Sequence, residues 1–209
     1  MRAADKYGKM GKIGGGRLAR LWELLGIEKG LTAVMGSGGK TSLLYELAEE
    51  LAAALAEHGA ACAVSYTAEG KLTAPGFPGW ETAADYVLVE ADGSKRLPAK
   101  AHAAWEPVLP PQRRRTVCVL GASAFGQTIR QSAHRPALYA ALAGASEEDV
   151  ITPALAARVL MAEGGFDMIY VNQIDREDFD PALAGAFAQA VDCPVVVGSL
   201  RQKRWKRLR

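Results

Sequence analysis

The chain has 209 residues, 49% of them hydrophobic, and its 25 basic and 23 acidic side chains leave a formal net charge of +2. This composition is that of an ordinary soluble globular protein, and so small a net charge does not indicate a nucleic-acid-binding protein. A chain of this length can bury the core of one α/β domain.

Neither a membrane segment nor a signal peptide is predicted. No apolar run approaches the roughly 18 residues of a membrane-spanning helix, and the first residues lack the apolar stretch of a secretory signal. Cys62, Cys118 and Cys193 lie far apart, without the spacing of a zinc site or a disulfide framework. We therefore expect reduced cysteines and a cytoplasmic protein with no membrane partner.

The chain is expected to divide into three parts. Residues 1–16 are basic, polar and rich in glycine, which predicts a flexible lead-in. Residues 17–200 are interpreted as a single P-loop α/β domain and residues 201–209 as a basic tail. A short helix is expected at the start of the domain, from Arg17 to Leu25, because Gly26 would end it.

A phosphate-binding loop is predicted where an apolar strand gives way to glycines and then to a helical pattern. The loop comprises Gly36, Ser37, Gly38, Gly39, Lys40, Thr41 and Ser42. Its backbone N–H groups would surround phosphate oxygens, Lys40 would reach the terminal phosphates and Thr41 would bind Mg²⁺. The pattern G-x-x-G-K-T is two residues shorter than the standard loop and resembles the ATP-binding loop of Mur-type peptide ligases. The alternative is a plain glycine turn with an incidental Lys-Thr.

Strands alternate with helices along the rest of the domain. Leucines at helical spacing extend the helix after the loop to about residue 58. Further strands are predicted at 61–66, 86–89, 116–120, 167–171 and 194–197, helices at 135–144, 153–163 and 181–191, and irregular chain at 67–82. This alternation predicts an α/β fold with a mostly parallel, P-loop NTPase-like sheet and helices on both faces.

Two carboxylates follow the strand predicted at 86–89. Glu90 and Asp92 would lie opposite the loop, where one could bind Mg²⁺ together with Thr41 while the other orients the attacking group. We therefore predict a catalytic set of Lys40, Glu90 and Asp92 and a metal site of Thr41, Glu90 and Asp92. Glu90–Gly93, read as E-x-x-G, resembles the switch segment of metallocentre-assembly GTPases. An acidic strand end without a function is the alternative.

A candidate base-binding segment follows the strand predicted at 167–171. Asn172 and Asp175 stand in the pattern N-Q-I-D, which resembles the guanine-reading N-K-x-D of GTPases with Gln173 in place of the lysine. In that pattern the aspartate accepts hydrogen bonds from the base and the asparagine braces the loop. The alternative is a strand end capped by polar residues. The short loop thus favours ATP, whereas Asn172 and Asp175 favour GTP.

Basic residues beyond the carboxylates suggest a second substrate. Lys95, Arg96, Lys100, His134 and Arg135 could neutralise phosphate charge or bind an anionic second substrate. A basic surface loop and a structural histidine are the alternatives.

The tail carries six positive charges in its last nine residues. We expect a solvated terminal helix or a frayed end, with binding to an acidic partner or nucleic acid as the alternative.

In this order the segments resemble the YqeC family, whose members are selenium-dependent hydroxylase accessory proteins, also called selenium cofactor biosynthesis proteins. The matching segments are Gly36–Thr41, Gly70–Thr73, Val87–Ser94, Pro98–Lys100, Glu106–Pro110, His134–Arg135 and Asn172–Asp175. One departure is the short Ser65–Glu69 stretch, where the family pattern carries a threonine run and a further segment.

The resemblance implies a cytoplasmic P-loop protein that helps to mature selenium-containing molybdenum hydroxylases. Its partner would be a molybdenum hydroxylase or a cofactor-synthesis protein, and a homodimer is left open. Together with the loop, the resemblance predicts binding and hydrolysis of ATP or GTP with Mg²⁺. One alternative is an ATP-dependent kinase or ligase for an anionic small molecule, and another is a non-catalytic chaperone that docks through the basic tail.

Overall fold

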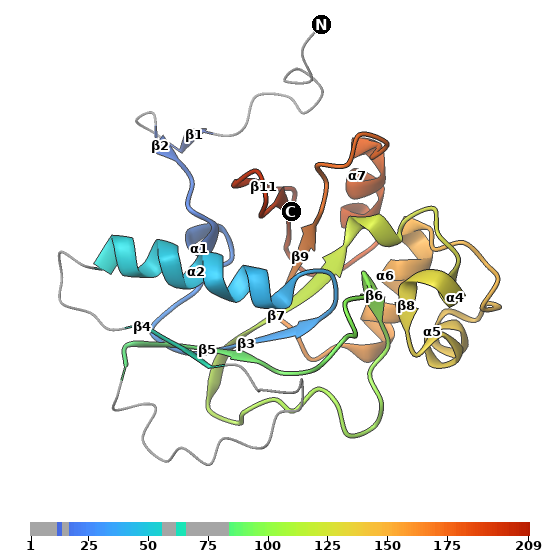
Figure 1. The fold of residues 1–209 in the computed structure, drawn as a ribbon, viewed down its shortest axis with the longest axis horizontal. Helices are drawn as coiled ribbons and strands as arrows, with labels where there is room; N and C mark the ends of the chain where they lie inside the picture. The colour runs from blue at the N-terminus through green and yellow to red at the C-terminus, as the bar shows by residue number, and fades with distance from the viewer. Residues whose placement is uncertain (1–11, 14–16, 56–61, 66–83) are drawn as a thin grey trace, which may run out of the picture.

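A mostly parallel β-sheet runs through the centre of the protein, in a computed structural model that describes residues 12–13, 17–55, 62–65 and 84–209 (Figure 1). Its strands are β3 (Gly30–Gly36), β4 (Cys62–Ser65), β5 (Tyr86–Glu90), β7 (Arg113–Gly121), β9 (Met168–Asn172), β10 (Val195–Ser199) and β11 (Arg204–Arg207). They lie in the order β11-β10-β9-β7-β3-β5-β4, and of these described strands only β11 is antiparallel to its neighbour.

Helices pack against both faces of this sheet. They are α1 (Leu21–Leu24), α2 (Lys40–Leu55), α4 (Ile129–Ser132), α5 (Pro136–Ala143), α6 (Pro153–Glu163) and α7 (Pro181–Gln189), with a 3₁₀ turn η3 (Ala122–Ala124). One buried cluster joins the sheet to α1 and α2, and another joins its other face to α5, α6 and α7. Covering on both faces explains why the central strands are apolar throughout. The predicted α/β class with a mostly parallel sheet is confirmed.

The central strand β3 leads directly into the predicted phosphate loop. It pairs with β5 on one side and with β7 on the other. The chain passes from β3 to β4 and β5 on one side and then crosses to β7 on the other side, so the direction of the strand order changes at β3. Ligands of open α/β sheets bind beyond the carboxyl ends of strands at such a change of direction. The loop and the end of β5 lie at this position in the protein (Figure 1).

The helix predicted from Arg17 to Leu25 is shorter in the structure. Arg17–Leu18 form strand β2, which pairs with β1 (Lys12–Ile13), and the helix α1 covers only Leu21–Leu24. The N-cap residue Arg20 precedes α1, and the half-buried carboxylate of Glu50 accepts from the backbone N–H groups of Leu21 and Trp22 at 3.0 and 2.9 Å. These contacts define the beginning of α1.

The terminal helix or frayed end expected for the basic tail is wrong for Arg204–Arg207. These residues form β11, paired with Val196–Ser199 of β10. The indole N–H of Trp205 donates to Ala19 O at 2.8 Å, and its ring packs on the core that contains α1 and α2. Alternation of a packed tryptophan with basic side chains suits an edge strand, whose positive charges also discourage further strand pairing.

A second small sheet, absent from the prediction, lies beside the main one. Strand β6 (Ala99–Lys100) pairs in parallel with β8 (Ala133–His134). It connects the segment that follows Asp92 with the start of α5.

Several predictions lie outside the described residues. They are most of the lead-in at 1–16, the irregular chain at 67–82, the Gly70–Thr73 segment and the Ser65–Glu69 stretch apart from Ser65.

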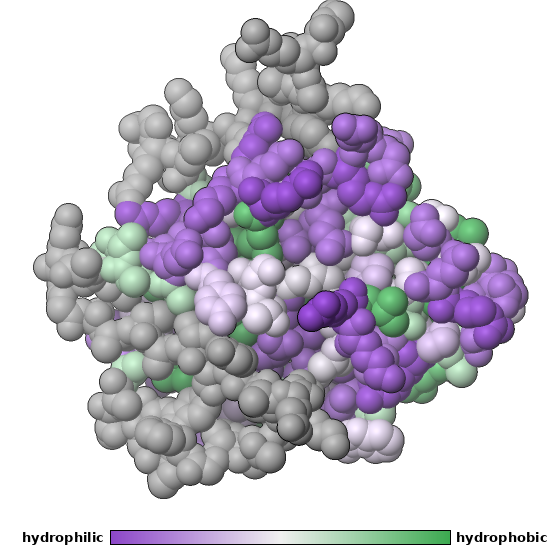
Figure 2. All heavy atoms as spheres, in the orientation of Figure 1, coloured by the Kyte–Doolittle hydropathy of each residue, from purple (hydrophilic) through white to green (hydrophobic). Residues whose placement is uncertain are grey.

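None of the helices described is long and apolar enough to cross a membrane. On the face shown in Figure 2, the described surface is mostly hydrophilic, with small and separate hydrophobic areas.

Candidate functional site

The loop between β3 and α2 packs so closely on β7 that two of its positions admit only glycine. A Cβ on Gly36 would lie 2.4 Å from Val119 O, and a Cβ on Gly38 would lie 2.3 Å from Gly121 N. Both residues have a φ of 93°, in the region that favours glycine. Ser37 N donates to Val119 O at 2.8 Å, and the Ser37 hydroxyl donates to Leu97 O. These contacts fix the loop between β7 and the segment after β5.

Asn172 holds the loop from the end of β9. Its Nδ2 donates to Gly38 O at 2.9 Å, and its Oδ1 accepts from Leu200 N at 3.2 Å. A Cβ on Gly39 would lie 2.5 Å from this Nδ2, so the amide and the loop fit only when residue 39 is glycine. The structure therefore places Asn172 against the loop, as a brace.

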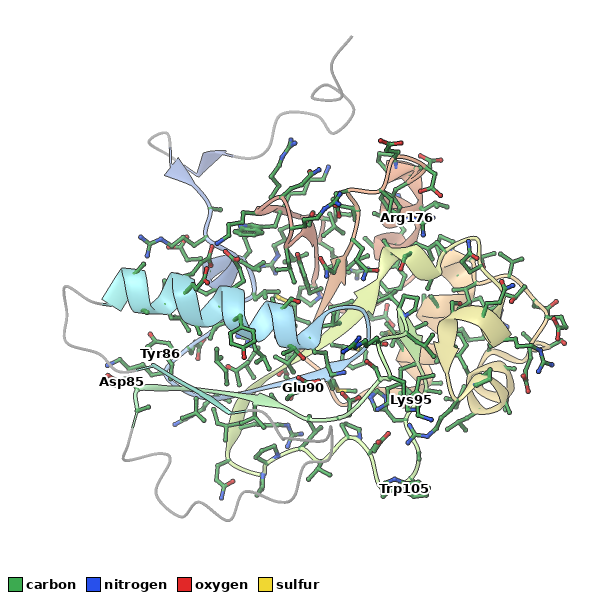
Figure 3. The ribbon with its side chains drawn as sticks, viewed as in Figure 1. Asp85, Tyr86, Glu90, Lys95, Trp105 and Arg176 are labelled. Carbon is green, nitrogen blue, oxygen red and sulfur yellow. The ribbon has the colours of Figure 1, made fainter. Side chains whose placement is uncertain are left out.

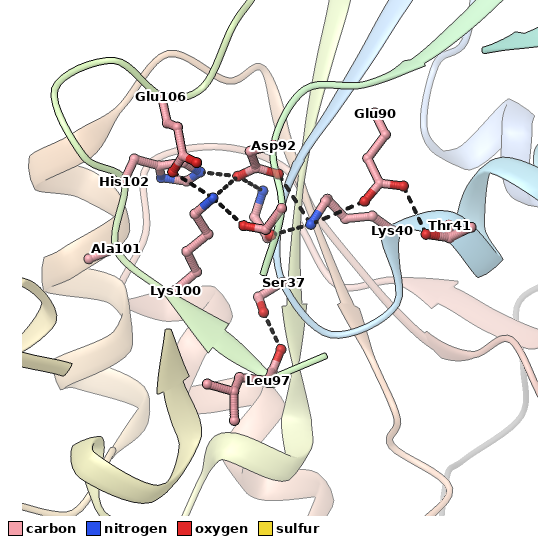
Figure 4. Close-up of polar contacts among 12 residues, drawn as sticks. Ser37, Lys40, Thr41, Glu90, Asp92, Leu97, Lys100, Ala101, His102 and Glu106 are labelled. Atoms are coloured by element: carbon pink, nitrogen blue, oxygen red, sulfur yellow. Dashed lines mark hydrogen bonds and ion pairs between the residues drawn. The ribbon is translucent and has the colours of Figure 1, made fainter. Parts of the chain in front are cut away.

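Lys40 is buried beneath the loop at the first turn of α2 (Figure 4). Its Nζ donates to Gly36 O at 2.7 Å and lies 3.2 Å from Asp92 Oδ1 and 3.6 Å from Glu90 Oε1. The ammonium group is thus held between the loop and the carboxylates at the end of β5.

Thr41 and Glu90 meet at the mouth of the site. The Thr41 hydroxyl donates to Glu90 Oε2 at 2.8 Å, and the Glu90 side chain remains 18% exposed. Hydroxyl and carboxylate oxygens are the ligands that Mg²⁺ prefers. Among the described residues, no group of three or more His, Cys, Asp or Glu side chains could hold a metal ion.

Asp92 is buried at the centre of a charged network. Its Oδ2 accepts from Gly36 N at 3.1 Å and lies 3.0 Å from Lys100 Nζ and 2.5 Å from His102 Nε2. Burial opposes ionisation, but the His102 hydrogen bond and the charges of Lys40 and Lys100 outweigh it and hold the pKa of Asp92 well below its usual value. Asp92 is therefore a carboxylate that joins the loop to three basic side chains.

His102 and Glu163 complete this network and were missed by the sequence analysis. Glu163 Oε2 lies 2.9 Å from His102 Nδ1, and Glu163 Oε1 accepts from His102 N at 2.6 Å. Burial lowers the pKa of His102, but hydrogen bonds to Asp92 and Glu163 raise it overall. The sequence could have indicated His102 only through its position two residues after Lys100. It gave no indication of Glu163, which follows 61 residues after His102, at the end of α6.

Lys100 and Arg135 share one carboxylate. Glu106 Oε2 lies 2.9 Å from Lys100 Nζ and accepts from Arg135 Nη1 at 2.6 Å, while Lys100 also donates to Gly93 O at 2.5 Å. Burial alone would raise the pKa of Glu106, but its hydrogen bonds with Arg135 and Lys100 lower it. The fully buried Lys100 side chain is thus occupied by groups of the chain itself.

The loop and the basic segment line one cleft of about 1480 Å³. The predicted residues on its wall are Gly38, Gly39, Lys40, Thr41, Ser42, Glu90, Asp92, Lys95, Arg96, His134 and Arg135. Of the other predicted residues in the described part of the chain, Gly36, Ser37, Lys100, Asn172 and Asp175 are not on this wall. The structure therefore brings together the predicted phosphate loop, the two carboxylates and four of the five basic residues that were predicted to bind a second substrate.

Asp175 lies in an adjoining depression of about 700 Å³, on whose wall Ser42 and Asn172 also lie. Its Oδ2 accepts from Arg201 Nε at 2.7 Å and lies 2.6 Å from Arg201 Nη2. The sequence analysis assigned this arginine only to the basic tail. Arg201 reaches Asp175 because β9 and β10 are parallel neighbours and the two residues follow the ends of these strands.

Comparison with known proteins gives one family. Residues 52–137 match the model of a family described as YqeC protein. The matched part contains β5, β6 and β7 and the positions from Glu90 to Arg135, and it begins after the loop at residues 36–41. No curated protein and no solved structure matches the chain.

Proposed function

We propose, for a chain that belongs to the YqeC family over residues 52–137, that it binds and hydrolyses a nucleoside triphosphate in the maturation of selenium-dependent molybdenum hydroxylases. The observation that carries the nucleotide part is the position of Lys40. Its ammonium group lies in the glycine loop at the beginning of a helix and faces Glu90 and Asp92. The family match carries the accessory role.

The loop would bind the phosphates. Its backbone N–H groups and the N-terminus of the 16-residue helix α2 favour an anion at this position. Lys40 is bound to Gly36 O and to carboxylates in the structure, and an incoming phosphate would offer it stronger anionic partners. We expect Lys40 to exchange at least part of these contacts for the terminal phosphates.

Thr41 and Glu90 would hold Mg²⁺, since their oxygens already meet at the mouth of the site. The metal would supply charge neutralisation at the terminal phosphates. Asp92 fits a different task, because its buried carboxylate is already bound by the loop, Lys40, Lys100 and His102. In this proposal Asp92 positions Lys40 and the loop, while Glu90 contacts the metal or orients the attacking water.

The base would lie in the depression that contains Asp175. The Asp175–Arg201 pair places a hydrogen-bond acceptor and a donor side by side there, and Asn172 fixes the loop to the same wall. ATP and GTP are the two candidates, and direct titration separates them.

Calorimetric titration with ATP and with GTP, each with and without Mg²⁺, tests the nucleotide site. We expect Mg²⁺-dependent binding of one nucleotide and a loss of affinity of about tenfold or more in Lys40→Ala. Lys29→Ala is the matched control, because Lys29 is 67% exposed and pairs with Asp85 away from the cleft. Unchanged affinity in Lys40→Ala, or equal losses in the two variants, would refute the assignment.

A second candidate is a kinase or ligase that acts on an anionic small molecule. It is favoured by the cleft, which continues from the phosphate loop to Lys95, Arg96 and Arg135. Release of ADP that depends on an added acceptor, and not on water alone, would favour this function over nucleotide hydrolysis.

A further inference from the structure

Two basic residues that line the cleft have no side-chain partner among the described residues. Lys95 and Arg96 are exposed, and within the described part of the chain neither has a hydrogen bond or ion pair through its side chain. The neighbouring arginines on the same wall are paired, Arg135 with Glu106 and Arg130 with Glu147 and Glu148. Two positive charges at this wall are therefore left without a partner among the described residues.

The backbone at these two residues is strained. Lys95 and Arg96 have φ values of 50° and 63°, and they occupy the centre of a turn in which Leu97 N donates to Ser94 O at 3.0 Å. Turns with two positive φ values favour Asn-Gly, because bulkier L-residues clash with their own backbone in this conformation. The turn thus carries two bulky basic residues in a conformation that they disfavour.

Strain of this kind is concentrated around the cleft. Of the five non-glycine residues with positive φ in the described part of the chain, four lie on its wall: Lys95, Arg96, Arg135 and Gln173. Residues held in sparsely populated backbone conformations gather at sites that bind ligands. The strained turn at Lys95 and Arg96 therefore has the character of a ligand-binding segment.

The cleft is also lined by the exposed aromatic ring of Trp105. Trp105 is 74% exposed and lines the same cleft, and Figure 3 shows Trp105 and Lys95 beyond the end of β5. Its segment is fixed from behind, because the adjacent Glu106 binds both Lys100 and Arg135. An indole presented on a rigid segment offers a flat face for stacking on a ring.

We propose that Lys95, Arg96 and Trp105, here called the cation rim, bind a second ligand in which a phosphate group is joined to a flat ring. The two basic side chains bind the phosphate, and the indole stacks on the ring. The inference rests on the proposed function only in placing this ligand beside a nucleotide, and binding at the rim is measurable without one.

Flavin mononucleotide is a suitable probe, because it joins a flat ring to one phosphate. Riboflavin has the same ring without the phosphate, and inorganic phosphate lacks the ring. Titration of the full chain is followed by flavin fluorescence and by calorimetry. We expect flavin mononucleotide to bind about tenfold more tightly than either partial probe.

The double variant Lys95→Asn/Arg96→Gly separates ligand binding from folding. It gives the turn its favoured sequence, so its Tm should rise by about 2–6 °C. Its affinity for flavin mononucleotide should nevertheless fall to that of riboflavin. Trp105→Ala should lower the affinity to that of inorganic phosphate. Arg130→Ala is the matched control, because this arginine lies on the same wall but is already paired with two glutamates, and its affinity should stay within about twofold of the parent chain.

Equal affinity for flavin mononucleotide and riboflavin would overturn the proposal, and so would unchanged binding in the double variant. A greater effect of Arg130→Ala than of the double variant would also overturn it. These outcomes are independent of the nucleotide site, whose own test is the loss of ATP or GTP binding in Lys40→Ala.

Discussion

Basic side chains in two parts of the cleft differ in burial and in pairing. On the loop wall, Lys40 is buried beside Asp92, which also binds the buried Lys100 behind it. Elsewhere in the cleft lining, Lys95 and Arg96 are exposed and have no partner among the described residues. A buried charge without a partner is costly, whereas an exposed charge is solvated by water. The buried lysines beside the loop must therefore have carboxylate partners for the protein to fold, whereas the exposed basic side chains of the cation rim need none.

This difference shows how a basic residue near a nucleotide site can be interpreted. Lys100 and Lys95 lie five positions apart in the same basic segment, and the sequence suggests one role for both. Their environments separate them, because Lys100 binds Asp92, Glu106 and Gly93 O inside the protein. We infer that Lys100 supports the loop wall and that Lys95 is available to a ligand.

Removal of Asp92 tests the loop wall most strongly. Asp92→Ala would leave the ammonium groups of Lys40 and Lys100 buried without their shared carboxylate, so we expect the free energy of unfolding to fall by about 3–5 kcal/mol. The corresponding Tm should fall by about 10 °C. Urea and thermal unfolding measure both quantities.

Asp85→Ala is the control for this change, because it breaks an exposed ion pair with Lys29 and should cost less than about 1 kcal/mol. Asp92→Asn keeps the shape and should give an intermediate loss. A loss in Asp92→Ala no larger than that in Asp85→Ala would show that the loop wall does not depend on this pairing.

Substitution of two glycines compares a packed position with an open one. Gly38 and Gly126 have similar φ values of 93° and 83°, but a Cβ on Gly38 would lie 2.3 Å from Gly121 N, whereas a Cβ on Gly126 meets nothing within 4 Å. Gly126→Ala should cost about 1 kcal/mol from backbone strain alone. Gly38→Ala adds the clash and should cost about 2–4 kcal/mol.

Nucleotide titration distinguishes the two glycine variants further. We expect Gly38→Ala to lose affinity by about tenfold or more, because its loop must shift from β7, and Gly126→Ala to retain the affinity of the parent chain. Equal destabilisation by the two substitutions would contradict the close packing of the loop on β7.

Much of the fold could be predicted because its signals are local. The apolar runs at β5 and β10, and the change from apolar strand to glycines to helix at residues 31–43, are read from neighbouring residues in the sequence. Helix α6 has the predicted bounds, with Pro153 at its first turn and Gly164 after its end. The basic tail was assigned the wrong structure, since its strand depends on pairing with β10 and on the packing of Trp205. The start of the helix predicted from Arg17 was also wrong, because Arg17–Leu18 pair with β1.

The site was less predictable because its polar partners are distant in the sequence. Glu90 and Asp92 follow a strand, which a pattern shows, but the contact between His102 and Glu163 depends on how α6 packs against the sheet. The Asp175–Arg201 pair likewise requires β10 to lie beside β9, since the two residues follow the ends of these strands. Burial of Lys100 also could not be predicted, because it depends on two carboxylates that arrive from different segments.

Glu106 joins the two walls, since its carboxylate binds Lys100 on one side and Arg135 on the other. Although burial opposes ionisation, these hydrogen bonds lower the pKa of Glu106 from its ordinary value of 4.5. The carboxylate therefore stabilises the folded protein fully above pH 4.5, and this contribution is lost as the pH falls through the lower pKa of the folded state.

Glu106→Gln should consequently lower the free energy of unfolding by about 1 kcal/mol near neutral pH, and the difference from the parent chain should shrink below pH 4.5. Urea unfolding between neutral and acidic pH measures it. Glu148→Gln, which alters an exposed pair with Arg130, should change stability less at every pH. If the Glu106→Gln difference grew as the pH fell, the carboxylate would be destabilising, and Lys100 and Arg135 would not be the groups that connect the walls.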